Sequence, residues 1–341
     1  MSDTVVFHNP LTAPFEIFGL YKPSSENGFC RLPKEVAKNV NPGVASLYLH
    51  TAGGRVRFAT DSDIITLRVS TGERTPMPHC TPLMEGGFDL YEDRDNESLF
   101  LGSFKYDTKN YREYEVSLSI PGGMKQLTLN MPLYGSVSEL SIGLRKDSVL
   151  QAHIPYRYSV PIVFYGSSIT QGACASRPGL CYQAYLSRRF DFDYINLGFS
   201  GNARGEDAIA EYMASLDMCA FVSDYDHNAP TPEHLKNTHH RLYRTIRNAH
   251  PDIPYFMITR PDFKFDSRED IKRRAIIMES YLKALSDGDE KVWFIDGSSF
   301  FSTDSRRECT TDGCHPTDLG FYRMAMVIGE VFENIKPFPG K

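Results

Sequence analysis

The stretch that decides the fold is Pro161-Ile162-Val163-Phe164-Tyr165-Gly166-Ser167-Ser168-Ile169-Thr170. A short apolar run ends in a glycine, which tolerates a tight turn, and polar residues follow at once. Apolar runs of this length, bounded by Pro, Gly or polar residues, are typical of strands that are buried on both faces. Similar runs recur at residues 194–197, 219–223, 255–258 and 292–295.

Helical patterns lie between these runs. Apolar residues recur at helical spacing within residues 209–216, and another helical pattern starts at Pro316. Strands that alternate with helices predict an α/β fold with a doubly wound parallel sheet. The clearest helical pattern places five apolar residues on one face: Ile271, Ala275, Met278, Leu282 and Leu285.

The first half of the chain has a different apolar period. Up to about residue 150 apolar and polar residues alternate, as at Ile65, Leu67 and Val69. Residues 47–58 place two glycines between alternating apolar residues, which predicts a hairpin. With no convincing helical stretch, this half is predicted to be an antiparallel, jelly-roll-like β-sandwich. The same alternation recurs within residues 116–120, 127–131 and 140–144.

The length of 341 residues suits two domains. We expect a β-sandwich domain over residues 1–155 and an α/β domain over residues 156–341, with the boundary inside residues 151–160. Each half is long enough to bury a core of its own.

Charge and hydropathy exclude several classes of partner. The net charge of -6 argues against nucleic acid, because phosphate binding needs a clustered excess of Lys and Arg. The one basic cluster, Lys272-Arg273-Arg274, stands beside acidic residues and is predicted to be a solvated helix face. No apolar run approaches the roughly 20 residues that span a bilayer, so no membrane partner is expected. The oligomeric state is left open.

The cysteines indicate a reducing compartment. Seven is an odd number, and the spacing is not that of metal ligands. We interpret them as mostly reduced thiols and predict a cytoplasmic protein. The first ten residues lack the basic start and apolar core of a secretion signal. A signal peptide removed beforehand would instead make the protein secreted or periplasmic.

Polar clusters follow the first three apolar runs of the second half. The carboxyl ends of parallel strands meet at one edge of a sheet, where ligands bind, so these clusters are predicted to lie together. In the first cluster Ser168 would expose its hydroxyl there, as a candidate nucleophile. The alternative is a helix cap or an ordinary polar loop.

A serine hydroxyl needs a base to accept its proton, and His315 is the best candidate among ten histidines. Asp312 precedes it by three residues, so the carboxylate can hold one ring nitrogen while the other faces the serine. A surface turn with a capping Asp would give the same spacing. His239-His240 are predicted to decorate a surface, and those in or beside the first half have no matching partner motif: His8, His50, His79 and His153.

The second and third clusters offer hydrogen-bond donors. The backbone N–H of Gly201 can donate to an oxyanion, although an ordinary Gly turn would look the same. Asn228 supplies a neutral amide. Asp226 and His227 could instead belong to a metal site, but no further ligand stands at suitable spacing. His227 can also be a structural residue or a substrate contact. Neither a nucleotide-binding glycine pattern nor a G-x-S-x-G elbow is present.

Taken together, the clusters resemble the SGNH, or GDSL-like, hydrolase superfamily, which carries Ser, Gly, Asn and His blocks in this order on a flavodoxin-like sheet. The resemblance implies Ser168 as nucleophile and one oxyanion donor, Gly201 and Asn228 as the other donors, and His315 as base oriented by Asp312. The four blocks fall at residues 166–169, 196–202, 226–229 and 312–315.

The chain departs from the family pattern at two points. Ser167 replaces the Asp usual in the first block, and Asp226-His227-Asn228-Ala229 replaces the usual Gly-x-Asn-Asp. Both departures resemble a two-domain subfamily in which a β-sandwich precedes the hydrolase. Gly87-Phe88-Asp89-Leu90-Tyr91 is similar to the Gly-x-Asp-Leu-Tyr signature of that N-terminal domain.

The resemblance implies a serine esterase that acts through an acyl-enzyme, with no metal or organic cofactor. The layout is also similar to carbohydrate esterase family 2, which implies a small acyl ester, such as an acetyl group on a carbohydrate, as substrate. Three alternatives stay open: acyl transfer to another alcohol, a non-catalytic carbohydrate-binding protein, and a metal-dependent hydrolase.

Overall fold

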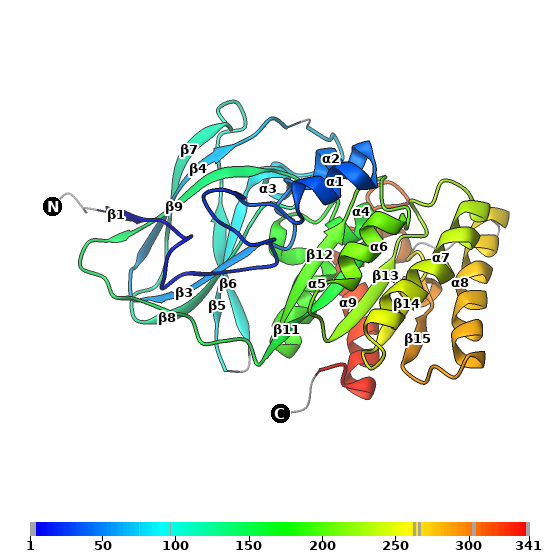
Figure 1. The fold of residues 1–341 in the computed structure, drawn as a ribbon. Coiled ribbons are helices and arrows are strands. Elements are labelled where there is room, and N and C mark those ends of the chain that lie inside the picture. The colour runs from blue at the N-terminus through cyan, green and yellow to red at the C-terminus, as the bar shows by residue number, and fades with distance from the viewer. Residues whose placement is uncertain are drawn as a thin grey trace.

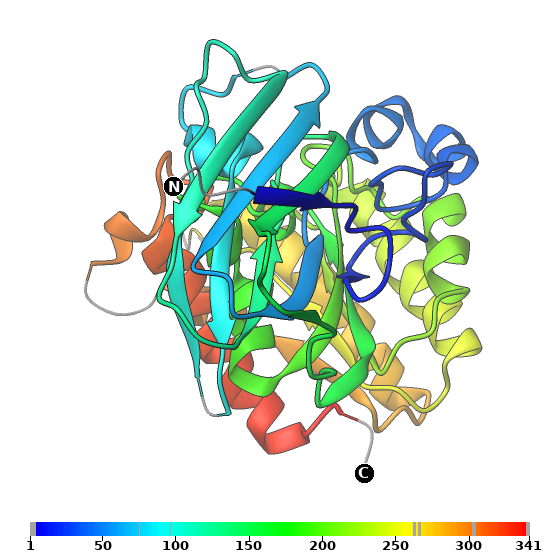
Figure 2. The ribbon, with the colours of Figure 1, turned by 90° about the vertical axis from the view of Figure 1, so that its left-hand side faces the viewer.

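The computed structural model describes residues 5–74, 76–95, 97–261, 264, 267–301 and 305–338. Antiparallel sheets form its first half, and strands alternate with helices in its second half (Figure 1). Figure 2 views the molecule with the antiparallel sheets in front of the parallel sheet. Both predicted fold classes are confirmed. The division at residue 155 stays a prediction.

Within its described residues, the first half contains two antiparallel sheets. One has the strand order β1-β9-β4-β7, and the other has the order β10-β3-β8-β5-β6, with β2 beside β3. The strands are β1 (Val5–His8), β2 (Glu16–Phe18), β3 (Arg55–Thr60), β4 (Ile64–Thr71), β5 (Phe88–Asp93), β6 (Ser98–Phe104), β7 (Glu113–Ser119), β8 (Lys125–Asn130), β9 (Val137–Arg145) and β10 (Leu150–Gln151).

The core of the sandwich lies between these sheets. Ile65, Leu67 and Val69 of β4 are buried, and they share one apolar cluster with Phe58 of β3 and Leu129 of β8. Period two therefore placed the inward residues correctly, because successive strand side chains point to opposite faces. The alternating runs predicted around residues 116–120, 127–131 and 140–144 form β7, β8 and β9.

The predicted hairpin at residues 47–58 is wrong, and so is the absence of helices in this half. Residues before Tyr48 form α2 (Pro42–Leu47), which follows α1 (Lys34–Val40), and α3 is Pro82–Gly86. The side chain of Asn41 caps α2 by accepting from the N–H of Val44 at 2.9 Å. These helices are too short to show a helical period, and a side-chain cap and a first-turn proline are the main local signals of α2 and α3.

The second half contains a parallel sheet with the order β12-β11-β13-β14-β15. Numbered within this sheet, the order is 2-1-3-4-5, which is that of flavodoxin-like folds. All five predicted apolar runs lie in these strands, or within one residue of them. The strands are β11 (Tyr158–Gly166), β12 (Phe192–Gly198), β13 (Ala220–Asp224), β14 (Tyr255–Ile258) and β15 (Val292–Ile295).

Helices cover both faces of this sheet. Ile162 and Phe164 of β11 belong to an apolar cluster with α5 (Tyr182–Phe190) and α9 (Asp318–Ile335). Val163 and Tyr165 belong to a second cluster on the opposite face. The helices of this second face are α6 (Asp207–Ala214), α7 (Pro232–Ala249) and α8 (Arg268–Ser286).

The predicted face of α8 is wrong. Ile271, Leu282 and Leu285 are 47%, 55% and 41% exposed, whereas Arg273 is buried. The Arg273 guanidinium donates to the carbonyls of Asp226 and Ala229 at 2.6 and 2.8 Å, so it holds a loop and does not lie on a solvated face. The buried face of α8 therefore carries the long side chain of Arg273, held by hydrogen bonds, where an apolar side chain was predicted.

Two further predictions about helices need correction. His239 of α7 is 1% exposed, so it is buried and does not decorate a surface. Its ring stacks on Tyr225 with the centroids 5.8 Å apart. The last helix begins at Asp318, two residues after Pro316, because the Thr317 side chain caps it.

The Gly-x-Asp-Leu-Tyr signature joins the two halves. Asp89 of β5 is fully buried and accepts hydrogen bonds from Arg177 and from the N–H of Gly179, both at 2.8 Å. Tyr91 accepts from Arg177 at 2.6 Å. The signature therefore fixes the loop between α4 (Ser168–Gln171) and α5, which follows the candidate nucleophile.

Candidate active site

Ser168 lies at the carboxyl end of β11, as the first residue of α4. Gly166 ends the strand where a Cβ would lie 2.2 Å from the carbonyl oxygen of Asp224, so only glycine fits there. Ser167 caps the helix by accepting from the N–H of Ile169 at 3.2 Å. The hydroxyl of Ser167 therefore helps to order the loop after β11. The N–H of Ser168 has no acceptor inside its helix, because it opens the first turn.

His315 contacts this serine from the turn before α9. The Ser168 hydroxyl lies 2.9 Å from His315 Nε2, and His315 Nδ1 lies 2.8 Å from Asp312 Oδ2. The other oxygen of Asp312 accepts from the N–H groups of Cys314 and His315 at 3.0 and 2.8 Å. Gly313 allows this tight turn because its φ is 78°.

The Asp312 carboxylate is held in its charged form. Partial burial opposes ionisation, but hydrogen bonds from His315 and Cys314 outweigh it and lower the pKa of Asp312 to about 2. The ionised carboxylate accepts a hydrogen bond from the N–H at His315 Nδ1. Nε2 then carries no proton and accepts a hydrogen bond from the Ser168 hydroxyl.

Gly201 lies in the turn after β12, with a φ of 70° and open space on its Cβ side. Among the described residues, no group accepts a hydrogen bond from its N–H. The turn is fixed to α4, because Gln171 Oε1 accepts from the N–H of Ser200 at 3.0 Å. The second cluster therefore lies beside the first, as the parallel topology predicts.

Asn228 follows β13 and contacts the same turn. Its Oδ1 accepts from the N–H of Ala203 at 3.4 Å, while its own N–H donates to Tyr225 at 2.9 Å. Within the described part of the chain, nothing accepts from its amide Nδ2. The amide is thus oriented by its oxygen, and its two N–H donors are available.

His227 lies against the His315 turn. Its Nδ1 is 3.7 Å from the sulfur of Cys314, and its Nε2 is buried with no partner among the described residues. Burial, followed by the charge of Arg260, holds the pKa of His227 well below its usual range, so the ring is neutral. Its neighbour Asp226 is also buried, and Oδ2 accepts from the N–H of Arg260 at 3.1 Å.

Asp224 lies beneath the site. It is fully buried, and its Oδ2 accepts from Thr170 at 3.0 Å and from Tyr182 at 3.4 Å. Burial, and the nearby charge of Asp226, raise the pKa of Asp224 well above its usual range. Its role in the site is to hold the loop after β11.

The first half supplies supporting residues that the sequence did not predict. Tyr134 donates to the Ser168 carbonyl at 3.4 Å, and Gln171 Nε2 contacts His50 Nδ1 at 3.1 Å. Arg31, 1% exposed, donates to the carbonyls of Asn196 and Gly198 and so fixes the end of β12. Only the fold brings these residues near the nucleophile, since more than thirty positions separate each from its partner.

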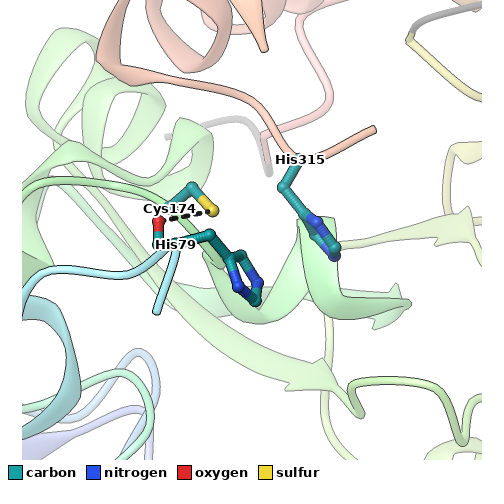
Figure 3. A group of neighbouring side chains, drawn as sticks. All are labelled: His79, Cys174 and His315. Carbon is teal, nitrogen blue, oxygen red and sulfur yellow. Dashed lines mark hydrogen bonds between the residues drawn. The ribbon is translucent and has the colours of Figure 1, made fainter. Parts of the chain in front are cut away.

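One group of side chains near the triad has metal-ligand character. Single ligand atoms of His79, Cys174 and His315 lie within 4.8 Å of one another (Figure 3). Within the described residues, Asp226 and His227 belong to no such group of three. The described residues thus supply no third ligand for the metal alternative based on those two residues.

A cavity of about 860 Å³ lies between the two halves, away from the triad. Arg55, Arg57 and His153 line it, whereas Ser168 and His315 do not. Arg55 forms an ion pair with Asp193, and Arg57 lies 3.7 Å from Asp93. The nucleophile and its base lie instead at the opposite end of the parallel strands.

Three solved structures share the fold of this chain over most of its length. A protein named as a GDSL-like lipase, from Bacteroides ovatus, is 29% identical and has a TM-score of 0.88. The match covers 99% of this chain and 100% of that protein's chain. A salicylyl-acyltransferase from a tetracycline biosynthetic pathway is 17% identical, with a TM-score of 0.81 over 98% and 99%. A family two carbohydrate esterase from Clostridium thermocellum is 17% identical, with a TM-score of 0.63 over 84% and 93%. No curated protein matches the chain.

Two families account for the chain. Residues 5–150 match the GxDLY family, the N-terminus of SGNH-hydrolase-type esterases. Residues 159–333, which hold all four clusters, match the GDSL-like lipase/acylhydrolase family. The resemblance of the motifs is thereby confirmed: the chain belongs to the GDSL-like lipase/acylhydrolase family and carries a GxDLY domain before its hydrolase fold.

Proposed function

We propose that the chain is a serine esterase that cleaves small acyl esters through an acyl-enzyme. The observation that carries this proposal is the continuous hydrogen-bond line from Ser168 through His315 to Asp312, with steps of 2.9 and 2.8 Å. A nucleophile, a base and an orienting carboxylate in this geometry are what acyl transfer requires.

The first step is attack of Ser168 Oγ on the ester carbonyl. His315 Nε2 takes the hydroxyl proton, and the Asp312 carboxylate stabilises the imidazolium that forms. The oxyanion accepts from the N–H groups of Ser168 and Gly201 and from the Asn228 amide. His315 then gives its proton to the leaving alcohol.

The second step releases the acyl group. His315 deprotonates a water that attacks the acyl-enzyme, and the proton returns to Ser168 as its C–O bond breaks. Apart from the water and the ester, every group in this cycle is a residue of the chain, so the proposed mechanism requires no metal or organic cofactor.

For the substrate we propose an acetyl or similarly short ester on a carbohydrate. The support is the shared two-part architecture with a protein named as a family two carbohydrate esterase, which was solved with cellohexaose. His227 is a candidate contact for the leaving sugar, because its buried Nε2 lacks a partner among the described residues beside the base.

Acyl transfer to an alcohol other than water is the second candidate. It is favoured by the likeness, across both halves, to a protein named as a salicylyl-acyltransferase. The same triad serves both reactions, because only the nucleophile of the second step differs. Measuring how product divides between free acid and a new ester, with added sugar or alcohol acceptors, separates them.

Labelling with a fluorophosphonate probe tests the serine mechanism. The wild type should react and Ser168→Ala should not, since phosphonylation needs the activated hydroxyl. Equal labelling of both proteins, or none of the wild type, would contradict the assignment. A panel of acetylated sugars and p-nitrophenyl esters of rising chain length then tests the substrate, which should be selected by the alcohol and by a short acyl group.

The location of the protein remains a prediction. None of the helices in the described part of the chain is long and apolar enough to cross a membrane. All seven cysteines are described and none forms a disulfide. We propose the cytoplasm as its compartment on the cysteine argument given above.

A further inference from the structure

Three side chains from separate parts of the chain converge beside the triad. One ligand atom each from His79, Cys174 and His315 lies within 4.8 Å of the other two. The two rings have centroids 5.5 Å apart and are inclined by 33°. In Figure 3 both rings and the sulfur lie around one small space.

Hydrogen bonds hold this arrangement in place. His79 belongs to the segment between β4 and α3, in the sandwich half, and its carbonyl accepts from the Cys174 thiol at 3.4 Å. Two residues further on, Thr81 donates to the carbonyl of Ser176 at 2.7 Å. The Thr81 bond joins the two segments beside the cluster and does not depend on the thiol proton of Cys174, and His315 is fixed separately by Asp312.

The donor set selects a type of ion. Two imidazoles and one thiolate are soft or intermediate ligands, which suit Zn²⁺ and exclude Mg²⁺ and Ca²⁺, whose ligands are oxygens. Zn–N and Zn–S bonds of about 2.0 and 2.3 Å require the three atoms to move closer by roughly an ångström. Three protein ligands leave a fourth tetrahedral position for water.

We propose that His79, Cys174 and His315 bind Zn²⁺ and that the bound ion switches the hydrolase off. Nε2 of His315 contacts Ser168 and Nδ1 contacts Asp312, so whichever nitrogen binds the ion must leave one of these partners. If Nε2 binds the ion, the ring leaves Ser168. If Nδ1 binds it, the proton of the neutral ring lies on Nε2, which then cannot accept the serine proton. This inhibitory consequence rests on the proposed function, whereas binding of the ion does not.

The site also links the two halves of the molecule. His79 comes from the sandwich half, while the other two ligands come from the hydrolase half. The Cys80 sulfur lies 3.8 Å from that of Cys174, so oxidation of this pair would remove the thiolate. Binding is therefore to be measured with both thiols reduced, in tris(carboxyethyl)phosphine and without other chelators.

The binding experiment uses zinc chloride and a chromophoric zinc indicator as competitor, with the full chain. Wild type and Ser168→Ala should each take up one tightly bound ion. Cys174→Ala should bind at least about tenfold more weakly. The matched control is Cys219→Ala, which removes a buried thiol just before β13, at the opposite edge of the sheet, and should bind as the wild type does. Equal affinity of wild type and Cys174→Ala would overturn the site.

A cobalt titration of the wild type covers the case in which Cys174→Ala does not fold. Co²⁺ in the same site should give a thiolate-to-metal charge-transfer band and intense tetrahedral d–d bands. Binding without a charge-transfer band would show that no thiolate coordinates the ion, and would overturn the proposal.

The activity experiment uses p-nitrophenyl acetate as substrate. Zn²⁺ should inhibit the wild type, EDTA should restore the rate, and His79→Gln should need at least about tenfold more Zn²⁺ for the same inhibition. A rate that rises with Zn²⁺, or equal sensitivity of His79→Gln, would overturn the inhibitory role. If the wild type binds one zinc ion but has no esterase activity, the proposed function fails and the site stands.

Discussion

The two ends of the strands in the parallel sheet differ in how their polar groups are paired. The carboxyl edge is the end that carries the candidate site, and the amino edge is the opposite end. At the carboxyl edge Gly201 N–H and the Asn228 amide have no acceptor among the described residues, and Ser168 meets a base. At the amino edge, which borders the large cavity, Arg55 is paired with Asp193 and also donates to a tyrosine hydroxyl. Hydrogen-bond donors without an acceptor beside a nucleophile indicate a catalytic role, whereas buried charges that are paired indicate a role in stability.

The comparison predicts that changes at one edge affect activity and changes at the other affect stability. The largest expected effect is that of Ser168→Ala, which should lower kcat by about 10⁶ because the nucleophile is lost. Its free energy of unfolding should change by no more than about 1 kcal/mol, because a single side-chain hydrogen bond is lost. The neighbouring Ser167→Ala is the control: loss of its cap should cost about 1 kcal/mol of stability and leave the triad in place.

Asp312→Asn should lower kcat by about 10⁴, because an amide no longer fixes the His315 tautomer or stabilises the imidazolium. Steady-state kinetics of the purified variant measures this. With the pKa of Asp312 at about 2, the wild-type carboxylate stays ionised down to pH 3, so the acid limb of the kcat profile should not follow Asp312. A loss below tenfold would show that Asp312 does not orient the base.

At the amino edge, Arg55→Met should cost about 3–5 kcal/mol of unfolding free energy, because the buried Asp193 loses its partner. The rate per folded molecule should be unchanged. Arg68→Met removes an ion pair with Glu115 that is more than half exposed and should cost at most about 1 kcal/mol. Urea unfolding and active-site titration of both variants decide this, and a large activity loss in folded Arg55→Met would break the comparison.

Asn228→Ala should lower kcat by about 10²–10³, which is the usual effect of losing one oxyanion donor. Asn228→Asp is the informative partner, since it keeps the oxygen that accepts from Ala203 but removes the donor. Both variants should lose kcat with little change in KM. Normal turnover by Asn228→Asp would remove this residue from the oxyanion hole.

The smallest expected effect concerns His239 of α7, which is buried without a partner for Nδ1 among the described residues and stacks on Tyr225. Burial, and then the charge of His240, lower the pKa of His239 to about 3. The unfolded state binds its proton below about pH 6.5, so stability is complete above that pH and is lost as pH falls toward 3. Between pH 7.5 and pH 5 the free energy of unfolding should fall by about 2 kcal/mol on account of this histidine.

His239→Phe should flatten this part of the stability profile and leave kcat unchanged. Thermal unfolding at several pH values measures the slope. An unchanged slope would show that other groups cause the acid sensitivity. A changed kcat would mean that His239 acts on the site through Tyr225 and the loop after β13.

Local patterns predicted the elements that have a regular environment. The runs that form β11 to β15 were predicted because both faces of a parallel strand are buried, and β4 was predicted because one face is. The face of α8 was not predictable in this way, since Arg273 reaches the carbonyls of a loop far away in the sequence. The short helices α2 and α3 were not predicted, because they contain less than two turns and show no helical period.

The same distinction holds for the candidate site. Asp312 and His315 share one turn, so their spacing in the sequence was enough to predict the contact between them. Ser168 was selected by its place after a strand. Tyr134 and His79 were missed because each touches the site only through the packing of the sandwich on the hydrolase half. Conversely, the paired charges at the amino edge have no local signature at all.

The central claim is that Ser168 becomes acylated during turnover. Mixing the wild type with p-nitrophenyl acetate, quenching with acid before the steady state and mapping the peptides by mass spectrometry tests it most directly. One acetyl group should be found on Ser168, together with a burst of nitrophenol equal to the enzyme concentration. Turnover with the acetyl group on another residue, or with no adduct and no burst while deacylation is slowed by low temperature, would contradict the account.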